Sequence, residues 1–64
     1  MSIRIDYSMS GMKVLYQRPY GNSPEEITVD CIIYDHFLNQ IIGIQGHDID
    51  GYEIQDIAES FMIK

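Results

Sequence analysis

The chain has no tryptophan and a single cysteine, Cys31. One cysteine excludes an internal disulfide, and an unpaired thiol is typical of proteins from a reducing compartment. Because Cys31 stands in the apolar run VDCIIY, we expect a buried thiol rather than a reactive one. Apolar runs near the roughly 20 residues that cross a bilayer are missing, and so is a basic-then-apolar leader. We therefore expect a cytoplasmic protein without membrane association.

Positive charge is also scarce. Four Lys and Arg residues stand against ten Asp and Glu residues, which gives a net charge of -6. Arg4, Lys13 and Arg18 lie near the start of the chain, and the stretch 19–63 contains carboxylates but no Lys or Arg. A nucleic-acid binder needs clustered basic side chains that displace phosphate counterions. The sequence predicts no direct nucleic-acid binding and, instead, electrostatic steering toward a protein partner with a basic surface.

Motifs for metal binding and catalysis are incomplete or missing. His36 and His47 stand alone, without the closely spaced His or Cys pairs typical of zinc sites. Asp48, Asp50 and Gly51 resemble a fragment of a calcium-binding loop that lacks a third alternating oxygen ligand. No phosphate-binding loop, dinucleotide fingerprint or nucleophile elbow is present. We expect no metal, no cofactor and no catalytic residue, and hence no enzyme.

The length of 64 residues predicts one small domain spanning 1–64. A domain of this size buries only about 60% of the surface that its unfolded chain exposes. Small domains often gain stability from disulfides, a metal or a second subunit, and the first two are not expected here. The sequence therefore predicts a homo-oligomer, most simply a dimer.

The first part of the chain alternates between apolar and polar residues. In SIRIDYSM, Ile3, Ile5 and Tyr7 fall on one face, which predicts a half-buried strand. MKVLYQ alternates again, with Val14 and Tyr16 on one face. The two runs are predicted to pair as an antiparallel hairpin, and the following RPYGNSPEE is predicted to be a loop.

The segment 24–38 carries two competing patterns. ITVDCIIYD is rich in β-branched residues and favours a strand. However, Ser23, Pro24 and Glu26 have the form of a helix start, with an N-cap, a proline at the first helical position and an acid at the third. We favour the strand, and leave the helix as the alternative.

The C-terminal part is equally ambiguous. QIIGIQG is predicted to be a strand in which glycine marks a bulge or bend, and Asp50-Gly51 predicts a hairpin turn. Beyond the turn, the segment 52–62 is compatible with two short strands around a short helical turn. Its apolar residues also follow the spacing of an amphipathic helix, as seen for Ile54, Ile57 and Phe61.

These elements together predict a mainly β fold. Five or six short strands in so short a chain suggest a small, strongly bent antiparallel sheet, or an SH3-like or Sm-like barrel. The alternative is an α+β fold with a C-terminal helix around 52–62.

The stretch HDIDGYEIQDIAES contains five carboxylates and no Lys or Arg. Tyrosine is enriched at protein interfaces, and two tyrosines fall in loop or turn contexts among the carboxylates. We therefore expect a non-catalytic interaction protein that inhibits or regulates a partner with a basic surface. The predicted contact residues are Asp48, Asp50, Tyr52, Glu53, Asp56, Glu59 and Tyr20.

Small acidic domains of this kind are, by analogy, typical of inhibitors from phages or mobile elements, some of which imitate the phosphate pattern of DNA. A mimic needs its carboxylates on one face. A helix over 52–62 would align Glu53, Asp56 and Glu59 along one flank, whereas a strand with a turn would scatter them. The alternative function is a homo-oligomeric small-molecule-binding module with a pocket between subunits.

Overall fold

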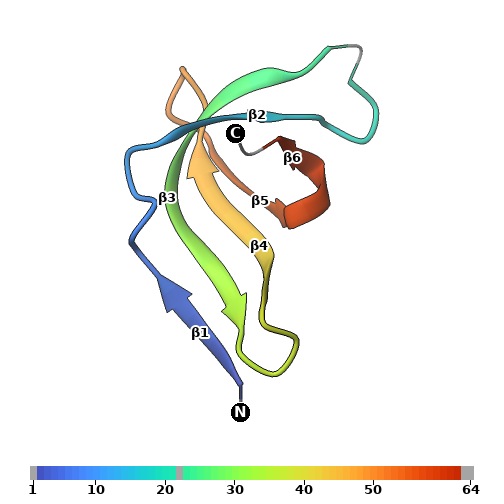
Figure 1. The fold of residues 1–64 in the computed structure, drawn as a ribbon. Coiled ribbons are helices and arrows are strands. Elements are labelled where there is room, and N and C mark those ends of the chain that lie inside the picture. Colours follow the sequence, from blue (N-terminus) through green and yellow to red (C-terminus); the bar gives the residue numbers. More distant parts are fainter. Residues whose placement is uncertain (1, 22, 63–64) are drawn as a thin grey trace.

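A computed structural model describes residues 2–21 and 23–62 and shows a mainly β fold (Figure 1). Its six strands form one antiparallel sheet that is strongly curled into a half-barrel. The strands are β1 (Ile3–Asp6), β2 (Lys13–Tyr16), β3 (Glu25–Asp35), β4 (Gln40–His47), β5 (Glu53–Ile57) and β6 (Phe61–Met62), with a 3-10 turn, η1 (Ala58–Ser60), between the last two. The predicted small, strongly bent sheet is confirmed.

The long strand β3 organises the sheet. The strand order is β5-β4-β3-β2-β6, and β1 also pairs with β3. On one edge of β3, β2 pairs with the first half and β1 pairs with the second half. β4 runs along the other edge. The curl brings β6 next to β2, where Phe61 lies opposite Tyr16 and their rings stack with centroids 4.7 Å apart.

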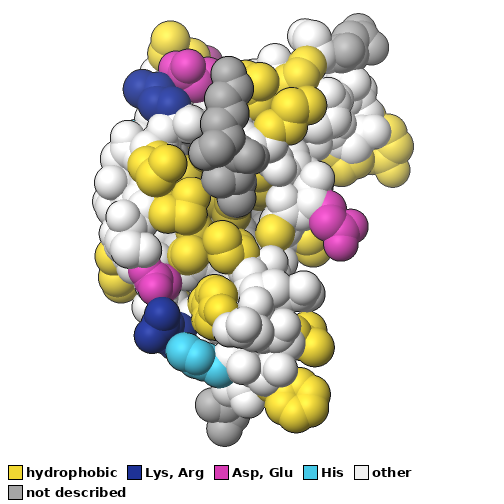
Figure 2. Space-filling view, in the orientation of Figure 1, with side chains coloured by type: hydrophobic (Ala, Val, Ile, Leu, Met, Phe, Trp, Pro, Cys, Tyr) yellow, Lys and Arg dark blue, Asp and Glu magenta, His cyan; other side chains and the backbone are white. Residues whose placement is uncertain are grey.

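The core fills the concave side of this curl. Its buried members come from β2 to β6: Val14, Tyr16, Ile27, Val29, Ile32, Ile44, Ile54 and Phe61. Most are β-branched, which suits a pleated surface packed on one face. Seen from the side of Figure 1, hydrophobic side chains gather in the middle and charged ones lie at the margins (Figure 2). Cys31 is buried, as predicted.

Two local features bend β3 against β4. The register shifts between Val29 and Cys31, which leaves Asp30 as an extra residue of a β-bulge. Opposite Val29 lies Gly46, where a Cβ atom would come within 2.3 Å of the backbone oxygen of Thr28. Only a residue without a side chain allows the strands to approach so closely. The irregularity predicted at the glycine within this strand lies beside Gly43, where a second register shift between Ile33 and Tyr34 leaves Ile42 as an extra residue.

The predicted hairpin between the first two runs is wrong. β1 and β2 do not pair with each other but follow one another along the same edge of β3. The connection between them is itself bound to β3, because Gly11 N donates to Val29 O at 2.8 Å and Val29 N donates to Met12 O at 2.8 Å. The turn therefore connects two strands that run in the same direction along one edge of β3, and it does not reverse the chain.

The predicted half-burial of the first strand is also wrong. Ile3, Ile5 and Tyr7 are 48%, 58% and 68% exposed. β1 pairs with the second half of β3, which extends beyond the core, so neither face of β1 is covered by another layer (Figure 1). The alternation correctly indicated a strand, but it did not indicate whether the apolar face is buried.

Both helix alternatives are wrong. The segment 24–38 contains β3, whose β-branched residues pair on both edges. The segment 52–62 forms β5, η1 and β6, so two short strands flank a short helical turn. Ile54 is buried and Ile57 is exposed, as expected for residues three apart in a strand.

Gly46→Ala is expected to lower the free energy of unfolding by about 3 kcal/mol, because the new methyl group meets a backbone carbonyl. Gly43→Ala on the same strand is the matched control. Its Cβ would meet the flexible end of Ile33 at 3.3 Å, so its cost stays below about 1 kcal/mol. Urea denaturation measures both values. Equal losses in the two variants would contradict this account of the bend.

Candidate functional site

The turn between β4 and β5 is shaped by one carboxylate. Asp48 Oδ1 accepts hydrogen bonds from Asp50 N at 3.0 Å and from Tyr52 N at 2.9 Å. Gly51 takes a left-handed φ of 88°, which a turn of this kind requires and glycine adopts without strain. The turn predicted at Asp50-Gly51 is confirmed. It leaves Ile49 96% exposed and Tyr52 72% exposed.

A shallow cleft of about 310 Å³ lies between this turn and the start of β3. Its lining consists of Lys13, Glu25, Glu26, Thr28, Asp48, Ile49 and Asp50. We call this the acidic cleft. The pairing of Thr28 with His47 brings the two carboxylates that open β3 next to the two of the turn. Four carboxylates from two distant parts of the chain therefore surround one hollow.

Two basic side chains neutralise part of this charge. Arg18 Nη2 lies 2.7 Å from Glu25 Oε1 and 3.8 Å from Asp48 Oδ2, and Lys13 Nζ lies 3.8 Å from Glu26 Oε1. The hydrogen bonds that Arg18 donates to Glu25 raise the pKa of the Arg18 guanidinium. In the described part of the chain, no basic side chain lies within ion-pair distance of Asp50. The cleft therefore retains excess negative charge.

Asp56 plays a different part from the other carboxylates of its segment. It lies on the concave face of β5, where Tyr16 Oη donates a hydrogen bond to Asp56 Oδ2 at 2.7 Å. This bond lowers the pKa of Asp56, while burial and the carboxylate raise the pKa of Tyr16. Its hydrogen bond makes Asp56 a structural link between β5 and β2.

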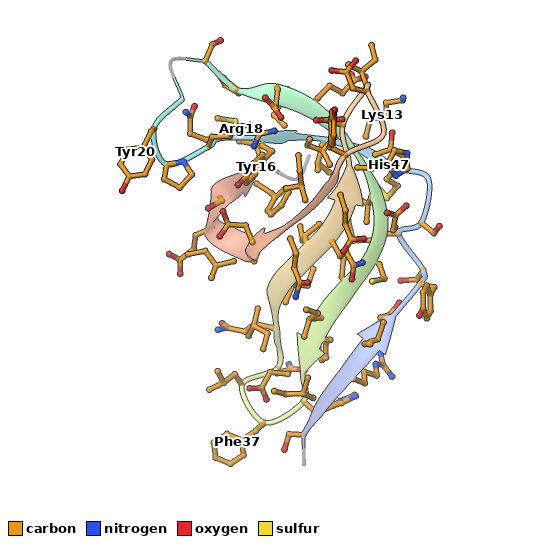
Figure 3. All side chains as sticks on the ribbon, turned by 180° about the vertical axis from the view of Figure 1, so that it is seen from behind. Lys13, Tyr16, Arg18, Tyr20, Phe37 and His47 are labelled. Carbon is orange, nitrogen blue, oxygen red and sulfur yellow. The ribbon has the colours of Figure 1, made fainter. Side chains whose placement is uncertain are left out.

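The remaining predicted contact residues are spread over the molecule. Glu53 lies at the start of β5, beside the turn, and Glu59 lies in η1 at the far end of β5. Tyr20 is 99% exposed in the β2–β3 loop and points away from the body of the protein (Figure 3). The structure brings Asp48 and Asp50 together in the cleft and keeps Tyr52 and Glu53 close to it along the chain. It separates these four from Asp56, Glu59 and Tyr20.

Sequence reasoning missed Glu25, Glu26 and Ile49 as members of this site. In the sequence, the two glutamates stand at the end of the predicted loop RPYGNSPEE. Their position became clear from the register of β3 against β4, which places Thr28 opposite His47. Nothing in the sequence alone specifies that register.

A histidine and a carboxylate pair across β3 and β4. His47 Nδ1 lies 3.0 Å from Asp30 Oδ1, and both side chains are close to half exposed. Within residues 2–21 and 23–62, no three His, Cys, Asp or Glu side chains are grouped closely enough to hold a metal ion. In the same residues, no helix has the length and apolar character needed to cross a bilayer.

Comparisons with known proteins give no relative. No protein-family model matches the chain, and no similar protein was found among curated proteins or solved structures. The functional argument therefore rests on the geometry of the site.

Because of the Tyr16–Asp56 hydrogen bond, we expect the difference in stability between the wild-type protein and a Tyr16→Phe variant to depend on pH. The pKa of Asp56 is lower in the folded protein than its ordinary value of 3.8, so the bond stabilises the fold above that value. This contribution is lost as the pH falls through the lower folded pKa. We expect Tyr16→Phe to lower the melting temperature at neutral pH, and the difference from wild type to shrink as the pH falls below 3.8.

Tyr34→Phe is the control for this prediction, because the Tyr34 hydroxyl bonds to the neutral side chain of Asn39. Its effect on the melting temperature is expected to change little over the same acid range. Thermal unfolding followed by circular dichroism measures both differences. An acid-independent effect of Tyr16→Phe would contradict the assigned role of Asp56.

Proposed function

We propose that this protein is a small non-catalytic interaction module that binds a basic segment of a partner protein at its acidic cleft and β4–β5 turn. Binding there would inhibit or regulate the partner. The observation that carries the proposal is the convergence of Glu25, Glu26, Asp48 and Asp50 around one hollow. Four carboxylates there face two basic side chains, so the site favours an additional cation.

The charge pattern of the whole chain supports the same site. Each Lys and Arg of the described residues lies within ion-pair distance of a carboxylate. Among those residues, the carboxylates without a basic partner are Asp35, Asp50, Glu53, Asp56 and Glu59, and two of these, Asp50 and Glu53, are exposed near the cleft. A partner that supplies Lys or Arg would be steered toward this end of the molecule.

Apolar surface beside the charges supports binding rather than simple solubility. Ile49 and Tyr52 project from the turn and are largely exposed. Interfaces usually combine a few apolar or aromatic anchors with a polar rim. The Asp48 hydrogen bonds hold the turn in place, so little conformational entropy is lost when a partner binds there.

An octalysine peptide is a suitable probe of the site. We expect binding that weakens steeply as salt is raised, because exposed ion pairs are screened. Asp50→Asn is expected to weaken binding about threefold, in keeping with the modest value of an exposed charge pair. Isothermal titration calorimetry at low and high ionic strength measures both effects.

Glu59→Gln is the matched control, since it removes one exposed carboxylate at the far end of β5. Its effect on peptide affinity is expected to be smaller than that of Asp50→Asn. Equal effects of the two substitutions, or binding that does not depend on salt, would refute the proposed site.

A further inference from the structure

β1 has an open edge that can pair with another strand. In the described sheet β1 pairs with β3 alone. His36 N donates a hydrogen bond to Ser2 O at 2.7 Å. In an antiparallel ladder, every second residue of a strand forms backbone hydrogen bonds with the same neighbouring strand. Arg4 and Asp6 therefore direct their backbone groups toward β3, while Ile3 and Ile5 direct theirs to the open edge.

The outer face of this part of the sheet carries a row of apolar residues whose two ends, Ile5 and Ile57, are 58% and 56% exposed. Residues directly opposite each other in neighbouring strands share a face. Ile5 lies opposite Ile33, Ile33 lies opposite Gly43, and Gly43 lies opposite Ile57. With the exposed Ile3 and Tyr7, these residues form an apolar row that begins at the open edge of β1.

The other face of β1 carries two opposite charges. Arg4 Nη2 lies 3.0 Å from Asp6 Oδ2, and the Arg4 guanidinium stands 5.5 Å from the centre of the Tyr34 ring. A basic and an acidic side chain lie near each other beside β1 in Figure 2. The strand thus reads apolar, basic, apolar, acidic, apolar from Ile3 to Tyr7.

We propose that β1 pairs antiparallel with β1 of a second copy of this chain, with Ile5 opposite Ile5 on the twofold axis. This register places Arg4 opposite Asp6 of the second copy, and Asp6 opposite Arg4 of the second copy. Ile3 meets Tyr7 of the second copy on the outer face. The backbone groups of Ile5 point toward the partner, as the ladder requires.

Charge complementarity favours a second copy over other occupants of this edge. Charged residues on an edge strand normally prevent self-pairing. In a pair of β1 strands centred on Ile5, however, Arg4 of each copy lies opposite Asp6 of the other copy. The charges therefore form two opposite-charge cross-strand pairs. The acidic cleft lies against the other half of β3, so the net negative charge of each copy is concentrated away from this junction. The proposal does not depend on the proposed function.

A strand pair of this length buries a small area, so a weak and concentration-dependent dimer is expected. Sedimentation equilibrium from micromolar to millimolar concentration measures the dimerisation constant. Arg4→Asp and Asp6→Arg are each expected to weaken self-association at least tenfold, because each places like charges opposite one another.

A mixture of the two variants provides the sharpest test. In a heterodimer of the Arg4→Asp and Asp6→Arg proteins, both cross-strand pairs have opposite charges again. The mixture is therefore expected to associate within about threefold of wild type, although neither variant does so alone. A mixture that associates no better than its components would overturn the proposed register.

Ile5→Pro tests the backbone pairing separately. The Ile5 N–H points to the open edge, where proline removes no bond within the chain. Self-association is expected to be lost while the circular dichroism spectrum remains that of a folded sheet. A wild-type protein that stays monomeric at millimolar concentration, or an Ile5→Pro variant that still dimerises, would overturn the proposal.

Discussion

The close approach of β4 to β3 at Gly46 is the contact on which the rest of this structure depends. The Thr28 carbonyl occupies the space in which any other residue would place a side chain. Together with the bulge at Asp30, this contact bends β3 sharply enough for the sheet to curl and for β6 to reach β2. A small core of mainly β-branched side chains then fills the concave face.

The bent strand also separates two surfaces of different character. Its first half holds the acidic cleft against the β4–β5 turn, and its second half carries β1, whose Ile3, Ile5 and Tyr7 are exposed. Tyr20 and Phe37 mark other exposed sites, in the loops before and after β3 (Figure 3). In the proposals made above, one end of the molecule receives a basic partner and the other receives a second copy.

Local patterns in the sequence predicted the elements well. Alternation indicated β1 and β2, the β-branched run indicated β3, and Asp50-Gly51 indicated a hairpin turn. Of the two interpretations of 52–62, the one with two short strands around a short helical turn is confirmed. The helical alternatives failed because strand pairing satisfies the backbone of both segments. β3 pairs with β1, β2 and β4, while β5 pairs with β4 and β6 pairs with β2. Periodicity could not show this, since it records the faces of an element and not its neighbours.

The arrangement of those elements could not be predicted from local patterns, because it depends on hydrogen bonds between residues far apart in the sequence. A hairpin was predicted because the first two runs are neighbours in the sequence. In the structure, the hydrogen bonds between Gly11 and Val29 and between Met12 and Val29 hold the connection of the two runs along β3. Of the predicted contact residues, Asp48 and Asp50 line the cleft, whereas Asp56 accepts the hydrogen bond from Tyr16. Glu25 and Glu26 join the cleft through the β3–β4 register, a long-range property that no local pattern encodes.

The proposed separation of a partner-binding surface from a self-association surface is tested most directly by mapping backbone amide chemical shifts. The octalysine peptide is titrated into labelled protein at a low and a high protein concentration. The account predicts peptide-dependent shifts confined to the start of β3 and the β4–β5 turn, and concentration-dependent shifts confined to β1 and its neighbours. Peptide-dependent shifts spread evenly over the surface, or centred on β1, would contradict it.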